Sequence, residues 1–312
     1  MDLLERSFRA MGTEIRVLVG PPAGPAPAAP ALAAVACEAA LIQFDHRLSR
    51  FRDDSELCAL NRDPRPTVPA SRLLRAAIGA GLWAAERSGG LVDPTLLGAL
   101  EHIGYAASRE ELERVPLAEA LEAAPIRRPA RARQPAAWRL FRLRADDERV
   151  ERPPGVMFDT GGTGKGLAAD LTAARLAGYA RYAIDCGGDV RVGGADPGAD
   201  AIEIEIRHPL SGEALATIPM RAGAIATSGL DVNVWRRPDG GYAHHLLDPA
   251  TGEPAWTGLI GVTALAPTAV AAETLTKAAL LSGPAGAAPF LEEHGGVVVS
   301  EDGSVGRFGP TR

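Results

Sequence analysis

Apolar and polar positions along the chain follow two periods, and together they predict a mixture of strands and helices. Strict alternation predicts half-solvated strands at residues 14–19 and 202–207. Apolar residues at helical spacing predict helices at residues 31–48, 71–88, 167–178 and 269–281. Short apolar runs predict further strands at residues 155–158, 182–185, 222–226, 261–265 and 296–300.

The predicted elements do not alternate in strict strand–helix–strand order. They therefore predict an α+β (mixed α/β) fold with mixed or antiparallel sheets flanked by helices, rather than a doubly wound parallel sheet. Asp54 or Ser55 is expected to cap a short helix. We expect one domain over residues 1–312, in which residues 106–150 form a charged insertion with a helix and a hairpin around residues 138–143.

The composition indicates a folded protein and argues against a nucleic-acid-binding function. The chain has 312 residues, 46% of them hydrophobic and 23% charged, as in proteins that form a core. Its net charge of -6 argues against a nucleic-acid partner. An arginine-rich run at residues 127–152 is interpreted as a solvated connection, and a docking surface for an acidic protein is the alternative.

The three cysteines lack the spacing of a disulfide framework or a zinc site, so we expect a reducing compartment. The first residues do not read as a secretory or lipoprotein leader. No run of 18 apolar residues indicates a membrane span. The sequence therefore predicts a cytoplasmic protein without stable membrane insertion.

A glycine-rich stretch at residues 159–166, Asp-Thr-Gly-Gly-Thr-Gly-Lys-Gly, follows the apolar run at residues 155–158. Four glycines and Lys165 predict a strand that opens into a loop whose backbone N–H groups face an anion. The spacing matches neither the Walker loop nor the dinucleotide fingerprint. A tight turn with a solvated lysine is the alternative interpretation.

Other candidate chemistry lies nearer the C-terminus. His245 precedes Asp248-Pro249 in a stiff turn, where it is either a reactive or a structural histidine. Glu273, Thr276 and Lys277 share one face of a predicted helix. The carboxylate and hydroxyl are ligands that Mg²⁺ accepts, whereas the alternative is a simple Glu–Lys pair. The chain contains two lysines, Lys165 and Lys277.

Together these motifs, in their order along residues 11–281, resemble the ApbE family of FAD:protein FMN transferases. The matching pieces are Met11-Gly12-Thr13, Phe51 with Asp54 to Asn61, Asp93-Pro94-Thr95, Asp159 to Gly166 with Asp170, Gly187-Gly188-Asp189, Thr227-Ser228-Gly229 and His245 to Gly252.

The resemblance implies an enzyme that cleaves the pyrophosphate of FAD with Mg²⁺. It then attaches FMN through a phosphoester to a threonine or serine of an acceptor flavoprotein and releases AMP. It implies catalytic roles for Lys165, which would hold phosphates, and for His245, which would take the hydroxyl proton, a task suited to a pKa near neutrality. The implied FAD contacts are Met11, Phe51, Leu91, Val92, Asp93, Asp159, Lys165, Gly187, Ser228 and His245. The implied metal ligands are Gly164, Glu273 and Thr276.

The sequence departs from the family pattern at the metal helix, where the family presents an aspartate and, four residues on, a threonine or serine. Here Glu273 and Lys277 occupy those positions. Either Thr276 substitutes as the hydroxyl ligand, or the Lys277 ammonium weakens or replaces Mg²⁺. A FAD pyrophosphatase that gives FMN and AMP, and a non-catalytic FAD-binding protein, are the alternative functions.

Overall fold

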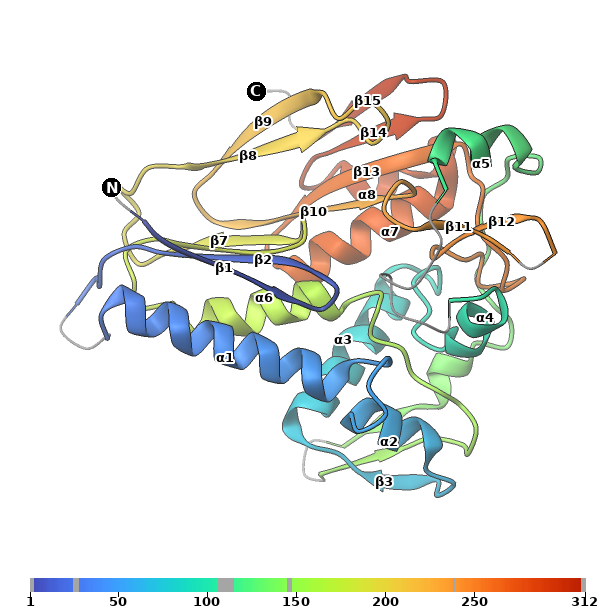
Figure 1. Cartoon of the computed structure of the whole chain (residues 1–312), viewed down its shortest axis with the longest axis horizontal. Coiled ribbons are helices and arrows are strands. Elements are labelled where there is room, and N and C mark those ends of the chain that lie inside the picture. The colour runs from blue at the N-terminus through green and yellow to red at the C-terminus, as the bar shows by residue number, and fades with distance from the viewer. Residues whose placement is uncertain (1–2, 25–27, 106–114, 145–147, 238, 310–312) are drawn as a thin grey trace.

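An eight-stranded antiparallel sheet runs through the molecule (Figure 1). The structure is a computed structural model that describes residues 3–24, 28–105, 115–144, 148–237 and 239–309. The strand order is β1-β2-β6-β7-β10-β13-β14-β15. These strands are β1 (Leu4–Ala10), β2 (Thr13–Val19), β6 (Tyr182–Cys186), β7 (Val190–Gly193), β10 (Gly223–Gly229), β13 (Leu259–Ala266), β14 (Gly296–Ser300) and β15 (Val305–Phe308).

Three helices cover one face of this sheet, and a hairpin covers part of the other (Figure 1). The helices are α1 (Pro30–Leu48), α6 (Gly164–Arg175) and α7 (Ala269–Gly286), and the hairpin is β8 (Ile202–Arg207) with β9 (Ala214–Met220). The alternating isoleucines of β8 pack with buried residues of β6, β7 and β10. Both faces of the central strands are therefore covered, and all residues of β13 except Leu265 are buried.

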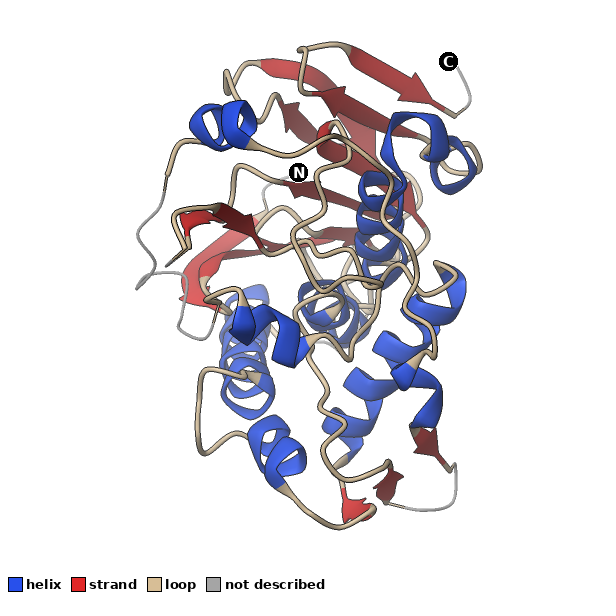
Figure 2. Ribbon diagram, turned by 90° about the vertical axis from the view of Figure 1, so that its right-hand side faces the viewer, coloured by secondary structure: helices blue, strands red, loops and turns tan. Residues whose placement is uncertain are grey.

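Smaller elements lie on the far side of the helix layer from the sheet or at one end of it (Figures 1 and 2). The helices are α2 (Glu56–Arg62), α3 (Arg72–Arg87), α4 (Leu97–His102), α5 (Leu117–Ala123), α8 (Ala288–Leu291) and the 3-10 turn η2 (Ala137–Leu140). The strands are β3 (Thr67–Pro69), β4 (Arg142–Leu143) and β5 (Arg149–Glu151), which form one sheet, and the pair β11 (Val234–Arg236) and β12 (Tyr242–His244).

The structure confirms the α+β class with antiparallel sheets, and the long predicted helices are present. Ser55 caps α2, because its hydroxyl accepts a 3.0 Å hydrogen bond from Cys58 N. The prediction missed β1, which pairs along its whole length with β2. None of the described helices is both long and apolar enough to cross a bilayer.

The strand predicted at residues 155–158 is wrong. Prolines 153 and 154 remove two backbone donors just before it, and Gly155 has a φ of 81°. The side chain of Asn61 takes the place of a neighbouring strand. It accepts from Phe158 N and donates to Phe158 O, both at 2.8 Å. The extended segment is therefore held by hydrogen bonds to one amide side chain instead of by pairing with a neighbouring strand.

The predicted hairpin around residues 138–143 is also displaced. Trp138 lies in η2, and the strand that follows, Arg142–Leu143, pairs with Arg149–Glu151. The loss of the ladder at Trp138 follows from the 3-10 turn, whose backbone cannot pair with a strand. The charged helix expected earlier in this region falls partly on residues 106–114, outside the described residues; its later part is α5.

Within the arginine-rich run, residues 127–131, here called the strap, form a connection whose backbone is bonded to the rest of the protein. Arg128 N donates to Trp256 O and Ala130 N to Leu281 O, at 3.1 and 2.8 Å. Arg131 N donates to Asp248 Oδ1 at 2.9 Å. The backbone of the strap therefore ties the His-x-x-Asp-Pro turn to the end of α7, while the Arg128 and Arg131 side chains remain exposed.

Candidate active site

The glycine-rich stretch forms a turn from which α6 begins. Gly164 N donates to Thr160 O at 2.7 Å, and the helix runs on from Gly164. A Cβ at Gly166 would lie 2.6 Å from Ala269 O, so glycine is needed for α6 to approach the start of α7. Asp170 ties the two helices together, because its carboxylate accepts from Ala269 N and Val270 N. Burial raises the pKa of Asp170.

Lys165, on the first turn of α6, forms an ion pair with Asp189. The Nζ to Oδ2 distance is 2.7 Å; the Asp189 side chain is 1% exposed, whereas that of Lys165 is 32% exposed. Burial opposes the charge on Lys165, but Asp189 and Glu273 outweigh it and raise the lysine pKa. Asp189 Oδ1 has no hydrogen-bond partner among the described residues. The ammonium is thus charged, anchored at one side and open to solvent at the other.

The turn that carries Asp189 joins β6 to β7 and requires glycine. Gly187 and Gly188 have φ values of 68° and 93°. A Cβ on Gly187 would meet the Thr13 side chain at 2.3 Å. This contact brings the β1–β2 turn, which contains Met11 at a φ of 53°, next to the turn of Asp189.

Lys277, the second lysine, is held on α7 by Glu273. Its Nζ lies 2.9 Å from Glu273 Oε1, with side-chain exposures of 10% and 0%. Gly166 N donates to Glu273 Oε2 at 2.9 Å. Burial raises the pKa of Glu273, although Lys277 opposes the shift. The two lysine pairs therefore meet where α6 touches α7.

Ser228 and Thr276 connect the sheet to the same face of α7. The Ser228 Oγ lies 2.7 Å from the Thr276 Oγ1, which also donates to Glu273 O at 2.8 Å. Both hydroxyls are buried and use their hydrogen-bonding capacity within the protein. The Glu273 carboxylate is likewise hydrogen-bonded within the protein, because each of its oxygens accepts from a protein donor.

Two adjacent histidines follow β11 in the paired strand β12 and its continuation. His244 is fully buried with its ring edge against Trp256, at a centroid distance of 4.6 Å. His245 is part-exposed, and its Nδ1 has no hydrogen-bond partner among the described residues. Burial, together with the charges of His244, Lys277 and Lys165, lowers the pKa of His245 to about 3. His245 is therefore neutral at neutral pH, and both lysines are near enough to act on it electrostatically.

The turn after α3 supports the glycine-rich stretch from the other side. Val92 N donates to the Ser88 hydroxyl at 2.9 Å, and the Val92 side chain lies against the backbone at Gly162. Asp93 Oδ1 accepts from Thr95 N and Thr95 Oγ1. Asp93 Oδ2 is buried without a partner among the described residues. Leu91 is half-buried and packs against the core.

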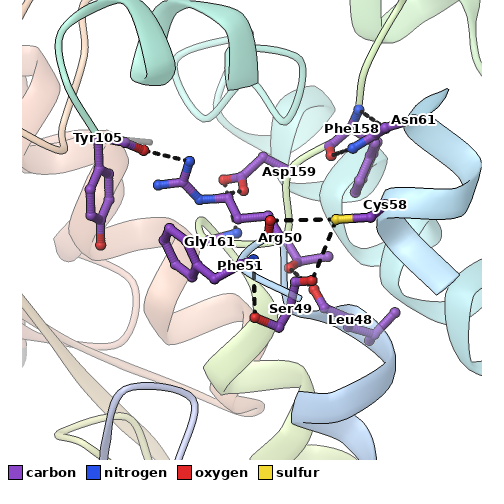
Figure 3. Close-up of polar contacts among 11 residues, drawn as sticks. Leu48, Ser49, Arg50, Phe51, Cys58, Asn61, Tyr105, Phe158, Asp159 and Gly161 are labelled. Atoms are coloured by element: carbon purple, nitrogen blue, oxygen red, sulfur yellow. Dashed lines mark hydrogen bonds and ion pairs between the residues drawn. The ribbon is translucent and has the colours of Figure 1, made fainter. Parts of the chain in front are cut away.

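A second polar cluster surrounds Arg50 at the other end of the glycine-rich stretch (Figure 3). Arg50 donates to Tyr105 O at 2.8 Å, and its Nε lies 3.5 Å from Asp159 Oδ1. Its guanidinium lies 4.3 Å from the ring centroids of both Phe51 and Tyr105. Phe51 is 41% exposed, so part of its ring is accessible to a ligand. Asp159 Oδ2 accepts from Gly161 N, which fixes the turn.

The structure thus brings most of the predicted site residues into two neighbouring groups. The first contains Lys165, Gly187, Ser228, His245, Glu273 and Thr276, and the second contains Phe51 and Asp159 beside the turn of Leu91, Val92 and Asp93. The sequence reasoning missed Arg50 and Asp189 as site residues. Each lies next to a residue or turn that had been singled out, Phe51 and Gly187-Gly188 respectively, which was the available signal.

The predicted metal ligands do not fit a divalent cation as they stand. The two carboxylate oxygens of Glu273 accept hydrogen bonds from Lys277 Nζ and Gly166 N. The Thr276 hydroxyl is hydrogen-bonded to the Ser228 hydroxyl. Gly164, whose backbone carbonyl is the third predicted ligand, is the first residue of α6. Within the described ranges, no group of three or more His, Cys, Asp or Glu side chains is placed to hold a metal ion.

The fold and the site define an α+β protein with a glycine-rich turn beside two lysine–carboxylate pairs and a neutral histidine. A family model described as the ApbE family matches residues 11–299. The chain belongs to the ApbE family.

Individual relatives agree with this assignment. A FAD:protein FMN transferase of Treponema pallidum is 31% identical over 280 residues, which cover 82% of this chain and 73% of the relative. One of Klebsiella pneumoniae is 28% identical over 266 residues, covering 83% and 73%. Among solved structures, the ApbE protein of Thermotoga maritima superposes with a TM-score of 0.78 at 25% identity, covering 98% of this chain and 97% of that chain. The apo flavinyl transferase ApbE of Pseudomonas stutzeri gives 0.77 at 25% identity, with 98% and 95% coverage.

Proposed function

We propose that this chain is a FAD:protein FMN transferase. A hydroxyl oxygen of a threonine or serine on an acceptor flavoprotein attacks the FMN phosphorus of FAD. The bond from that phosphorus to the bridging oxygen breaks, AMP leaves with that oxygen, and the hydroxyl proton passes to His245. The relatives named above carry this activity in their names, and the residues of this chain supply groups suited to it.

The observation that carries the proposal is the pair of anchored ammonium groups that both act on the pKa of His245. Lys165 presents a charged, one-third exposed side chain at the start of α6, where the helix dipole also favours an anion. Lys277 is anchored by Glu273, with 2.9 Å between Nζ and Oε1. A pyrophosphate placed against these charges would have its developing negative charge stabilised as AMP leaves.

His245 is the group that accepts the proton. Without substrate its pKa lies well below the neutral value that suits general base catalysis, because the site is buried and contains two lysines. The phosphates of FAD bring negative charge next to both lysines, which raises the histidine pKa. The base is therefore weak in the empty site and strengthens when substrate is bound.

The flavin end of FAD fits the cluster around Arg50. The exposed part of the Phe51 ring offers a stacking surface, and Asp159 and Asp93 each keep one buried oxygen without a hydrogen-bond partner among the described residues. Such oxygens are acceptors for ring N–H or ribityl hydroxyl groups. Met11 is proposed to contact FAD from the β1–β2 turn, which lies next to the turn of Asp189.

The reaction is proposed to take place in the cytoplasm. The three cysteines, Cys37, Cys58 and Cys186, are buried free thiols, as is usual for proteins of reducing compartments. Cell fractionation with an antibody to the chain tests this proposal. Recovery of the protein in an exported fraction would contradict it.

The activity is tested with purified protein, FAD and an acceptor flavoprotein domain that carries a threonine target. Flavin fluorescence that remains on the denatured acceptor, together with one AMP per label, is the expected result. An acceptor whose target threonine is replaced by valine is the matched control. Release of free FMN and AMP without a label on any acceptor tested would instead identify a FAD pyrophosphatase, and intact FAD would identify a binding protein.

A further inference from the structure

We infer that the ammonium group of Lys277, held by Glu273, provides the fixed positive charge that a divalent cation would otherwise supply, so that this chain binds FAD without Mg²⁺. The inference rests on the proposed function for the identity of its ligand, FAD. It is carried by the way the buried groups of α6, α7 and β10 already satisfy one another.

The first argument is the use of donors and acceptors. A divalent cation needs several oxygen ligands with free lone pairs. Glu273 Oε1 accepts from Lys277 Nζ, and Oε2 accepts from Gly166 N, both at 2.9 Å. Thr276 Oγ1 lies 2.7 Å from Ser228 Oγ. To bind a metal here, the protein would have to break the buried Lys277–Glu273 ion pair, and the metal would have to share oxygens that already take part in hydrogen bonds.

The second argument is charge. The pairs Lys165–Asp189 and Lys277–Glu273 bring two positive and two negative charges into the site, so they cancel. With an uncharged side chain at residue 277, the same group would carry one net negative charge and would attract a cation. With Lys277 present, a divalent cation would instead leave a net charge of two in a region where the Glu273 side chain is 0% exposed.

The third argument is position. Lys277 and Lys165 act on the same histidine, since both lower the pKa of His245. The Lys277 ammonium, fixed 2.9 Å from Glu273 Oε1, therefore belongs to the same site as the proposed general base. Lys277 is the less exposed lysine, at 10% against 32%, so it is the more fixed of the two charges.

The direct test is FAD binding by the wild-type protein, measured by quenching of flavin fluorescence in EDTA and in Mg²⁺. The expected Kd differs by less than about threefold between the two. Titration with Mn²⁺, followed by electron paramagnetic resonance, is expected to show no tight site with or without FAD. A sub-millimolar Mn²⁺ site, or a loss of FAD affinity of about tenfold or more in EDTA, would overturn the inference.

Variants of residues 273 and 277 provide the second test. Glu273→Asp with Lys277→Thr removes the ammonium and shortens the carboxylate. We expect this double variant to lose about tenfold in FAD affinity in EDTA, to recover it with Mg²⁺, and to gain a Mn²⁺ signal. Lys277→Arg keeps the charge and is expected to remain independent of metal. If the double variant fails to fold, the wild-type titrations alone decide.

The outcome separates this inference from the proposed activity. Metal-independent FAD binding without any labelled acceptor would leave the role of Lys277 standing and refute the transfer. Transfer that is abolished by EDTA would leave the activity standing and refute the role of Lys277. Binding measurements need no acceptor, so an unsuitable acceptor cannot obscure the result.

Discussion

The two lysine pairs use the same chemistry in different surroundings. Lys165 is paired with Asp189 on a glycine turn, and its side chain is 32% exposed. Lys277 is paired with Glu273 one helical turn earlier on α7, and the carboxylate is 0% exposed. Asp189 is as buried as Glu273, at 1% exposed, so the difference lies in the lysines: the Lys165 side chain reaches solvent, where a ligand can meet it, whereas Lys277 is part of the helix packing. The comparison shows how one site can combine a charge that is accessible to a ligand with one that is enclosed.

The largest expected effect is at His245, the group on which both lysines act. His245→Ala should lower the transfer rate by about 10² to 10⁴-fold, because the general base is lost. FAD affinity should change by less than about threefold, since the phosphates are held by other groups. Labelling kinetics and fluorescence titration measure the two quantities. An equal loss in both would show that His245 binds FAD rather than accepting a proton.

The second prediction breaks each ion pair in turn. Lys277→Met leaves Glu273 buried without its partner and should lower the free energy of unfolding by about 3 to 5 kcal/mol. Lys165→Met should lower it less, because water reaches the site that the more exposed lysine vacates. Urea denaturation of both variants gives the comparison. Adding Glu273→Gln to Lys277→Met should recover part of the loss, and equal losses for the two single variants would contradict the distinction.

The third prediction concerns the contact that brings the two pairs together. Gly166→Ala places a Cβ 2.6 Å from Ala269 O and should destabilise the protein by about 1 to 3 kcal/mol through overpacking. Gly164→Ala is the matched control in the same helical turn, since its nearest neighbour would be the Thr160 Cβ at 3.6 Å. Thermal denaturation should place Gly164→Ala close to the wild type. A similar loss in both would mean that the α6–α7 contact does not decide, because helix propensity by itself favours alanine at both positions.

The smallest effect separates the two histidines. Burial lowers the pKa of His244 to about 3, and neither lysine contributes. Above its ordinary value of 6.5, His244 does not favour unfolding. As the pH falls from there towards about 3, the unfolded chain takes up a proton that the folded protein refuses. The free energy of unfolding should therefore fall by up to about 1.4 kcal/mol per pH unit from this residue.

Urea denaturation at pH 7.5, 6 and 5 measures that slope. In His244→Gln the slope of the free energy of unfolding against pH should be smaller, by the equivalent of up to about one bound proton. Lys277→Met should leave the contribution of His244 unchanged, which makes it the control. Identical slopes in wild type and His244→Gln would show that the imidazole is protonated in the folded state.

The sequence predicted the long helices, and it singled out residues that the structure brings close together, because those signals are local. The apolar spacing of α7 and the glycines around Lys165 are visible within short windows. The scarcity of lysine pointed to both ion-paired residues. Arg50 was missed because its partners, Tyr105 and Asp159, are more than 50 residues away. The hydrogen bonds between the Asn61 side chain and the Phe158 backbone were missed for the same reason, because the two residues are far apart in the sequence. These bonds replace the strand pairing that the apolar run at residues 155–158 predicted.

The order of the sheet has a consequence for handling the protein. The two outer strands, β1 and β15, are the first and last described strands of the chain. Removing β15 would uncover β14, whose Val297, Val298 and Val299 are buried. An apolar, unpaired edge of this kind invites pairing with another molecule. Truncation at the C-terminal end should therefore promote aggregation before it affects the chemistry, so tags are best added outside β15 rather than in its place.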